Sequence, residues 1–311
     1  MKSSCFGAVV VVVLPLAGCF DLDSFVWNPR HCSAPSDELC AEKNVCTPCG
    51  EPLPFEKVGI PVEKVTRHPI ALEDGETNDS WFVASAGGAL SDVTIVFSHG
   101  NFGGLEHYLN RVGLLFETGA NIYAVDYRGF GQSSTTAEPT EAQFLSDTSR
   151  ARAGLPAILQ EHGVSSSAVV LMGYSAGALS AVEMGVTDSS CAMVLEAPWP
   201  SVQAFADDST FIGVPGSFVT TGAWDNITKM RSYTKPYLHL HGTEDQTVRI
   251  ELGEELFDGA GSSEKELVRV DGADHGNFLG KEGDIPDVPA VLGAEAYAQK
   301  LATFVGGLAC D

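Results

Sequence analysis

One segment near the middle of this chain joins a strand to a helix through a very short turn. Ala168–Gly173 is a continuous apolar run that predicts a buried strand, and Ala176–Gly185 has the small residues of a closely packed helix. The glycines of Gly173-Tyr174-Ser175-Ala176-Gly177 carry no Cβ, so strand and helix can approach closely. Such a turn exposes the Ser175 hydroxyl above the end of the strand, at a helix N-terminus whose partial positive charge favours a developing anion.

Strand-like and helix-like segments alternate along most of the chain. This alternation predicts an α/β fold with a mostly parallel central sheet and helices on both of its faces. The segments with strand character are Val62–Pro69, Trp81–Ala86, Val93–Ser98, Asn121–Asp126, Ala168–Gly173, Ala192–Glu196, Tyr237–His241 and Glu266–Val270. The helical segments are Leu105–Thr118, Thr140–His162 with a kink or break at Pro156, Ala176–Gly185, Arg249–Phe257 and Ala290–Val305. Residues 197–234 are expected to be irregular.

A serine hydroxyl is a weak nucleophile, and it needs a neighbouring base. His275 is the best-placed histidine, because it lies in a loop just after the strand Glu266–Val270. Such a loop lies at the carboxyl edge of a parallel sheet, where ligands bind. We expect His275 to accept the proton of Ser175 and later donate it to the leaving group, so activity should fall as acid protonates the ring.

An acidic residue should orient the imidazole of His275. Asp245 follows the strand Tyr237–His241 and is the expected partner, since its carboxylate would accept the Nδ1–H of the ring. Glu244 is the nearest rival, and Glu196, after another strand, is a further alternative. Asp274 is adjacent to His275, and adjacent residues usually cannot present their side chains in the required line.

The arrangement resembles the α/β-hydrolase superfamily over roughly residues 62–305. The resemblance rests on Gly173–Gly177, on His-Gly-x-x-Asp-x-x-Val at residues 241–248, and on the chain order Ser175, Asp245, His275. It implies the α/β-hydrolase fold with a short cap insertion at 197–234. The most similar members would be small serine hydrolases with little or no lid, of the dienelactone-hydrolase-like and prolyl-oligopeptidase-like kinds.

The resemblance also implies where an oxyanion would be held. In such enzymes one backbone N–H comes from the residue after the nucleophile, here Ala176, and another from a loop after an early strand. Ser98–Gly104 is that loop, and either Asn101 or Phe102 is the expected donor. His99 is expected to have a structural role in holding the loop.

The cap insertion leaves two interpretations open. Its aromatic residues could line an acyl pocket or could form the core of a small cap. They are Trp199, Phe205, Phe211, Phe218 and Trp224. The insertion lacks the length of a large amphipathic lid, which favours a soluble or small ester over a triglyceride droplet.

The N-terminal sequence is typical of an exported protein. Lys2 precedes a twelve-residue apolar run from Cys5 to Leu16, which is shorter than the roughly 20 residues that span a membrane and fits a signal peptide. Leu16-Ala17-Gly18-Cys19 resembles the bacterial lipobox. That resemblance implies cleavage before Cys19 and a diacylglycerol on its sulfur, anchoring the chain to a bacterial membrane on the periplasmic or cell-surface side. The alternative is an ordinary secretory signal with a chance cysteine.

Three segments therefore follow one another. Residues 1–18 are the expected signal peptide, residues 19–61 a tether with a cysteine-stapled part, and residues 62–311 the hydrolase domain.

Six cysteines remain besides Cys5 and Cys19, and an even number in an exported protein suggests disulfides. They are Cys32, Cys40, Cys46, Cys49, Cys191 and Cys310. The first four are expected to pair among themselves in an arrangement that the sequence does not choose, and Cys191 could pair with Cys310. The alternative for Cys46-Thr47-Pro48-Cys49 is a zinc site, but no second CxxC follows at zinc-ribbon spacing, so we expect no metal.

Composition narrows the function further. With 41 acidic and 18 basic residues, the net charge of −23 argues against nucleic acid and against binding anionic lipid through surface charge. The expected function is that of an exported, lipid-anchored serine hydrolase acting on a small-molecule carboxylic ester, with no cofactor. There are two alternatives. One is a serine peptidase or amidase with the same three residues, and the other is a non-catalytic binding protein on a hydrolase fold.

Overall fold

A computed structural model of the chain describes residues 31–32, 47–165, 168–187, 190–209, 222–276, 287–308 and 310. The expected signal peptide and the lipid attachment at Cys19 lie outside these residues, as do Cys40, Cys46, Phe211 and Phe218. No helix among the described residues is long and apolar enough to cross a bilayer.

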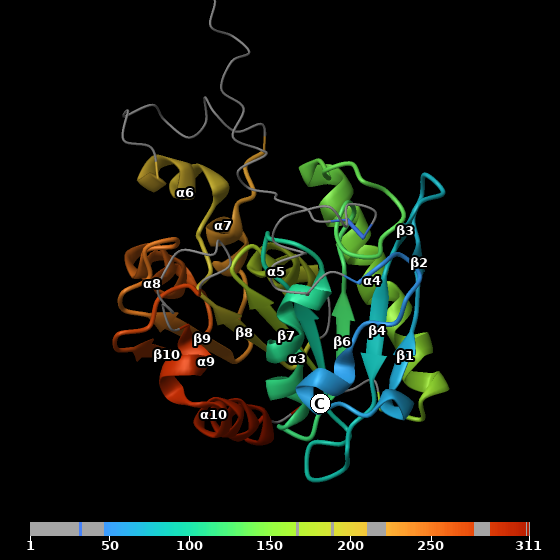
Figure 1. The fold of residues 1–311 in the computed structure, drawn as a ribbon. Coiled ribbons are helices and arrows are strands. Elements are labelled where there is room, and N and C mark those ends of the chain that lie inside the picture. The colour runs from blue at the N-terminus through green and yellow to red at the C-terminus, as the bar shows by residue number, and fades with distance from the viewer. Residues whose placement is uncertain are drawn as a thin grey trace, which may run out of the picture.

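An eight-stranded sheet runs through the molecule in the order β1-β4-β6-β5-β7-β8-β9-β10 (Figure 1). Its strands are β1 (Val65–Arg67), β4 (Ser80–Val83), β6 (Asn121–Val125), β5 (Thr94–Ser98), β7 (Val169–Tyr174), β8 (Ala192–Glu196), β9 (Tyr237–Gly242) and β10 (Lys265–Val270). The neighbouring strands β6, β5, β7, β8, β9 and β10 run parallel to one another, whereas β4 is antiparallel to both of its neighbours, β1 and β6. A separate hairpin pairs β2 (Ile70–Ala71) with β3 (Thr77–Asn78). The predicted α/β class with a mostly parallel sheet is confirmed.

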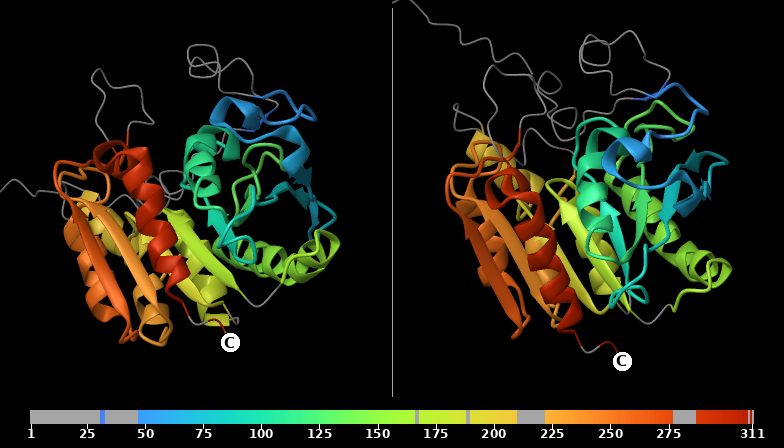
Figure 2. Two further views of the ribbon diagram at one scale, coloured as in Figure 1. Left: turned by 90° about the horizontal axis from the view of Figure 1, so that it is seen from below. Right: turned by 60° about the horizontal axis from the view of Figure 1, so that its bottom comes forward.

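Helices cover both faces of this sheet (Figure 2). One face packs against α3 (Leu109–Phe116), α9 (Val288–Leu292) and α10 (Ala294–Gly306), and the other against α4 (Glu141–Glu161), α5 (Gly177–Thr187) and α8 (Ile250–Gly259). Ile95 and Phe97 of β5 lie in the first core, and Val96 between them lies in the second. Because successive side chains of a strand point to opposite faces, burial of both faces requires the continuous apolar runs seen in the sequence.

Three predicted elements differ from the observed ones. The first predicted strand is shorter, since Val62–Lys64 forms the 3₁₀ helix η2 and only Val65–Arg67 pairs. Pro156 does not break α4, whose core-facing side chains on both sides of the proline are buried. The last helix is two helices, because Gly293 at φ 83° separates α9 from α10 in a conformation that other residues rarely adopt.

Residues 197–234 are less irregular than predicted. They contain α6 (Val202–Ser209) and α7 (Asn226–Met230), and the side chain of Asp225 caps α7 by accepting a hydrogen bond from Thr228 N–H. Three of the described aromatic residues of this region pack into one buried cluster with residues from the sheet edge and α4. The aromatic members of that cluster are Trp199, Phe205, Trp224, Tyr127, Phe130 and Phe144. This packing favours the cap-core interpretation for Trp199, Phe205 and Trp224.

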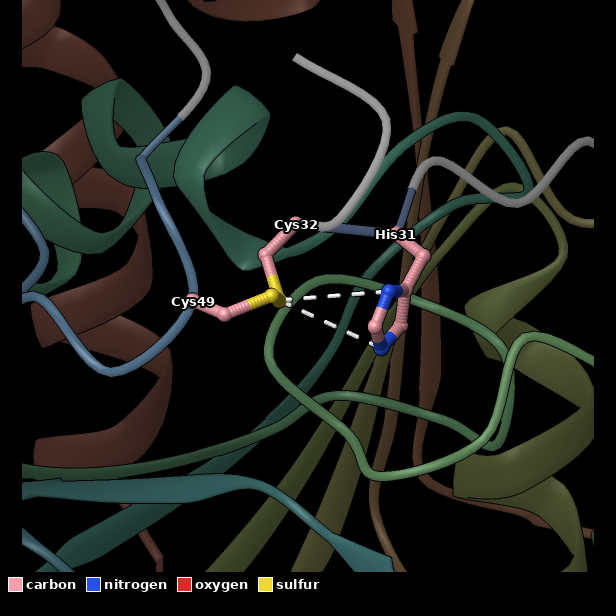
Figure 3. Close-up of side chains that lie close together, drawn as sticks. All are labelled: His31, Cys32 and Cys49. Carbon is pink, nitrogen blue, oxygen red and sulfur yellow. Dashed lines mark hydrogen bonds between the residues drawn. A yellow bond between two sulfur atoms is a disulfide. The ribbon is translucent and has the colours of Figure 1, made fainter.

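Two of the expected disulfides are present. Cys191 pairs with Cys310, which ties the end of the chain to the start of β8, and Cys32 pairs with Cys49. Figure 3 shows the Cys32–Cys49 disulfide beside the ring of His31. The sulfur of Cys32 lies 3.9 Å from each nitrogen of that ring. The sulfur of Cys49 is therefore committed to a disulfide and offers no thiolate to the zinc site considered for the CxxC.

Candidate active site

Ser175 lies at the end of β7 with its backbone in the left-handed region, at φ 52°. The two glycines that flank it are required by close backbone contacts. A Cβ on Gly173 would lie 2.6 Å from the carbonyl oxygen of Gly177, and a Cβ on Gly177 would lie 2.0 Å from that of Ser98. The strand–turn–helix geometry predicted from Gly173–Gly177 is therefore present, with a strained serine at the apex.

The structure brings Ser175, His275 and Asp245 together from three separate loops. The Nε2 atom of His275 lies 2.9 Å from Ser175 Oγ, and its Nδ1 atom lies 2.8 Å from Asp245 Oδ2. The three residues follow β7, β10 and β9, whose carboxyl ends share one edge of the sheet. Since a carboxylate only accepts, the ring donates Nδ1–H to Asp245 and accepts the hydroxyl proton of Ser175 at Nε2.

Several donors hold the Asp245 carboxylate in its charged form. Its Oδ1 atom accepts hydrogen bonds from the backbone N–H groups of Thr247 at 2.9 Å and Val248 at 2.7 Å. Burial disfavours the charge, but the charge of His275 and hydrogen bonds from His241 and His275 outweigh it and hold the pKa of Asp245 below its usual range. Asp245 therefore stays ionised at neutral pH, and its charge lies where it would stabilise an imidazolium at His275.

A buried row of side chains on β9 supports Asp245 from behind. His241 Nε2 lies 2.8 Å from the carbonyl oxygen of Val248 and 3.4 Å from Asp245 Oδ2, so this nitrogen carries the proton. Its Nδ1 then accepts from His239 Nε2 at 3.1 Å, and His239 Nδ1 accepts from the Tyr237 hydroxyl at 2.9 Å. Burial lowers the pKa of His239 well below its usual value, which keeps the His239 ring neutral. The sequence did not indicate that these histidines are linked to Asp245.

The rival acidic residues occupy other positions. The Glu244 side chain is exposed. Asp274 accepts from the backbone N–H groups of Gln246 at 3.2 Å and His275 at 2.5 Å, so it fixes the loop rather than the imidazole. Glu196 binds Arg111 and Tyr297 instead.

The loop expected to supply an oxyanion donor follows β5. His99 is buried there, with Nδ1 2.7 Å from the Gly100 carbonyl oxygen and Nε2 3.2 Å from Asp126 Oδ1, as its expected structural role requires. Phe102 N–H donates to the Tyr108 hydroxyl at 3.3 Å, so an oxyanion would have to displace that partner. Ala176 is buried in the turn before α5.

Tyr174 and Arg111 support the catalytic loop, and sequence reasoning missed both. The Tyr174 hydroxyl donates to the carbonyl oxygen of His275 at 2.5 Å, and its ring stacks on the imidazole with centroids 5.3 Å apart. The Arg111 guanidinium lies 3.9 Å from the centre of the Tyr174 ring and pairs with Glu196 at 2.9 Å and Asp287 at 3.1 Å. Tyr174 stands inside the recognised turn, but no local pattern links Arg111 to it.

Replacing Arg111 should destabilise the protein strongly. Arg111→Met removes the cation that neutralises buried Glu196, and breaking such a pair costs about 3–5 kcal/mol of unfolding free energy. Urea unfolding followed by circular dichroism measures this loss. The double variant Arg111→Met/Glu196→Gln, which leaves no unpaired charge on Glu196, should recover part of it. Equal stabilities of wild type and Arg111→Met would contradict the proposed importance of the pair.

A buried carboxyl next to the oxyanion loop predicts a pH effect on stability. Burial and the nearby charge of Asp126 raise the pKa of Glu106 to about 8, although the Thr47 N–H works against the rise. Between about pH 4.5 and about pH 8, the folded protein therefore holds a proton on Glu106 that the unfolded chain has released. The free energy of unfolding falls as pH rises through this range. Glu106→Gln should raise the unfolding temperature by about 5 °C at pH 9 and leave it unchanged at pH 4. Thermal unfolding at both pH values checks this, with exposed Glu63→Gln as the control; equal shifts in both variants would contradict it.

Parts of the chain are similar to known proteins. Residues 95–233 match the profile of the alpha/beta hydrolase family. The uncharacterized protein YfhR of Escherichia coli K12 is 27% identical over 220 residues, which cover 68% of this chain and 74% of YfhR. Human alpha/beta hydrolase domain-containing protein 17B is 31% identical over 183 residues, covering 58% of this chain and 60% of that protein. The Pyrococcus furiosus esterase Pf2001 is similar in structure, with a TM-score of 0.62 at 18% identity over 90% of this chain and 97% of Pf2001.

Proposed function

This chain has the α/β-hydrolase fold, and on that basis we propose that it is a serine hydrolase that cleaves a carboxylic ester through an acyl-enzyme. The observation that carries the proposal is the hydrogen-bonded path from Ser175 Oγ through His275 to Asp245. Each step lies within 3 Å and all three side chains are buried, so the path is formed before a substrate arrives. The solved relative Pf2001 is named an esterase, which supports an ester as the first substrate class to test.

The proposed reaction has two halves, each with two proton transfers at one imidazole. Ser175 Oγ attacks the acyl carbon while His275 Nε2 takes its proton, and Asp245 stabilises the resulting imidazolium. The carbonyl oxygen becomes an oxyanion that Ala176 N–H and a donor from Asn101 or Phe102 would hold. His275 then gives the proton to the leaving alcohol. In the second half, water attacks the acyl carbon while His275 takes its proton, and the imidazole returns that proton to Ser175 Oγ as the acid leaves. The reaction requires no cofactor.

Paired substrates test the class of bond. We expect the purified full chain to hydrolyse p-nitrophenyl esters from acetyl to dodecanoyl, with the short chains cleaved fastest because the described cap aromatics fill their own cluster. The matching p-nitroanilides should be cleaved more slowly. Faster cleavage of the anilides would support the peptidase or amidase alternative instead. Absence of turnover on every ester and anilide, together with tight binding of a protein partner, would favour the binding-protein alternative.

We also propose that the protein is exported and held on a bacterial membrane by a lipid on Cys19. The support is the sequence alone, namely the apolar run Cys5–Leu16 followed by Leu16-Ala17-Gly18-Cys19. Growth with an alkyne-tagged palmitate should label the wild-type protein and leave it in the membrane fraction. Cys19→Ser should be unlabelled and should leave that fraction; membrane retention of the unlabelled variant would contradict the anchor.

A further inference from the structure

A cluster of two histidines and a glutamate lies at the edge of the sheet that carries β1, far along the strand order from β7, β9 and β10 (Figure 1). His68 follows β1, and Glu161 and His162 end α4. One side-chain atom from each lies within 4.8 Å of the others. Neither the proposed hydrolase reaction nor any sequence motif accounts for this cluster.

The two imidazoles face each other through equivalent nitrogens. His68 Nε2 lies 3.1 Å from His162 Nε2, and the rings meet edge to face with centroids 5.3 Å apart. A zinc ion bonds imidazole nitrogen at about 2.0–2.1 Å, so a nitrogen separation of 3.1 Å corresponds to an N–Zn–N angle of about 98°. That angle lies between the square and tetrahedral values, so one ion can bind both nitrogens without moving either ring far.

The surrounding structure holds the backbone of His68 and the ring of His162 in place. The backbone N–H of His68 donates to the carbonyl oxygen of Ser80 on β4 at 2.8 Å. The His162 ring stacks on buried Phe82, with centroids 4.2 Å apart and an angle of 25° between the planes. A ring that is already fixed loses little side-chain entropy when it binds an ion, which favours affinity.

The third ligand and the local charge suit a cation. The Glu161 side chain is exposed, so its carboxylate can rotate toward the two nitrogens. Its position in the last turn of α4 places the ion near the negative end of the helix dipole, in a chain whose net charge is −23. Two imidazole nitrogens and one carboxylate oxygen suit Zn²⁺, whereas Ca²⁺ and Mg²⁺ prefer oxygen ligands throughout.

We propose that His68, His162 and Glu161 bind a zinc ion, with water completing the coordination, and that the ion ties the β1–β2 connection to the end of α4. In the metal-free protein one Nε2–H donates to the other Nε2. When zinc binds, both rings carry their proton on Nδ1 and both Nε2 lone pairs point to the metal.

Zinc titration of the EDTA-treated full chain tests the site by calorimetry. We expect one high-affinity Zn²⁺ per chain, and no comparable binding of Ca²⁺ or Mg²⁺. His68→Gln and His162→Gln should each weaken zinc binding at least about tenfold, and Glu161→Gln by a smaller factor. His31→Gln is the matched control, because His31 lies beside a disulfide rather than beside a second histidine, and it should bind zinc like the wild type.

Two further readouts keep the result independent of folding defects in the variants. The zinc-induced rise in unfolding temperature is measured for each variant against its own metal-free form, and it should vanish in His68→Gln and His162→Gln only. X-ray absorption at the zinc edge should show two imidazoles and no sulfur. Wild-type affinity in His68→Gln, loss of binding in His31→Gln, sulfur ligation, or failure of the wild type to bind zinc would each overturn the proposal.

Discussion

Ser175→Ala should abolish covalent labelling by a fluorophosphonate probe and lower kcat/KM for ester hydrolysis by about 10⁴–10⁶-fold. The hydroxyl supplies the atom that bonds to the acyl group, and neither His275 nor the backbone donors can replace it. Alanine keeps the Cβ that serine carries at φ 52°, so the backbone strain is unchanged and the variant should fold like the wild type. Gel fluorescence measures labelling, and p-nitrophenol release measures turnover.

Ser232→Ala is the matched control for this variant. Ser232 is exposed after α7 and donates to the carbonyl oxygen of Lys229 at 2.8 Å, so its loss should leave labelling and turnover as in the wild type. Equal labelling of wild type and Ser175→Ala would remove the nucleophile assignment, and with it the proposed acyl-enzyme.

Asp245→Asn should lower kcat by about 10⁴-fold. The amide group can donate a hydrogen bond to His275 Nδ1, which favours the tautomer that carries its proton on Nε2 and therefore cannot accept the serine proton. The variant also lacks the negative charge that stabilises the imidazolium.

The charge of Asp245 also contributes to stability, because folding lowers the pKa of this carboxyl group. That contribution is present above the pKa of the unfolded carboxyl group and is lost as pH falls through the pKa of the folded one. Urea unfolding of wild type and variant at pH 7 and pH 2 should therefore show a difference that shrinks in acid.

Glu244→Gln separates the role of Asp245 from a general effect of charge near the loop. Glu244 is the adjacent residue and is exposed, so its neutralisation removes one negative charge without touching His275. Its kcat should stay within about twofold of the wild type, as expected for a solvent-screened charge. A loss as large as that in Asp245→Asn would show that Glu244 is the residue acting on the imidazole.

The catalytic candidates were predictable because each carries a local signal. Ser175 lies in a five-residue turn between a buried strand and a helix, and Asp245 and His275 lie in loops that directly follow predicted strands. Parallel strands bring such loops to one edge whatever their separation along the chain, so topology supplied the convergence. The helix does not break at Pro156, and residues 197–234 contain two short helices where an irregular segment was predicted, because buried contacts and the Asp225 cap outweigh the local pattern.

Apolar periodicity and turn chemistry, which act between residues a few positions apart, determined the fold class and the nucleophilic turn of this protein. Packing alone decided which polar groups meet outside the predicted Ser175–His275–Asp245 set. Arg111 reaches Glu196, and His68 reaches His162, only because helices from different parts of the chain cover the same sheet. A buried ion pair such as Arg111–Glu196, or a partly buried imidazole pair such as His68–His162, leaves no local pattern. Its energy depends on a partner that the folded backbone brings near and on the water that it excludes.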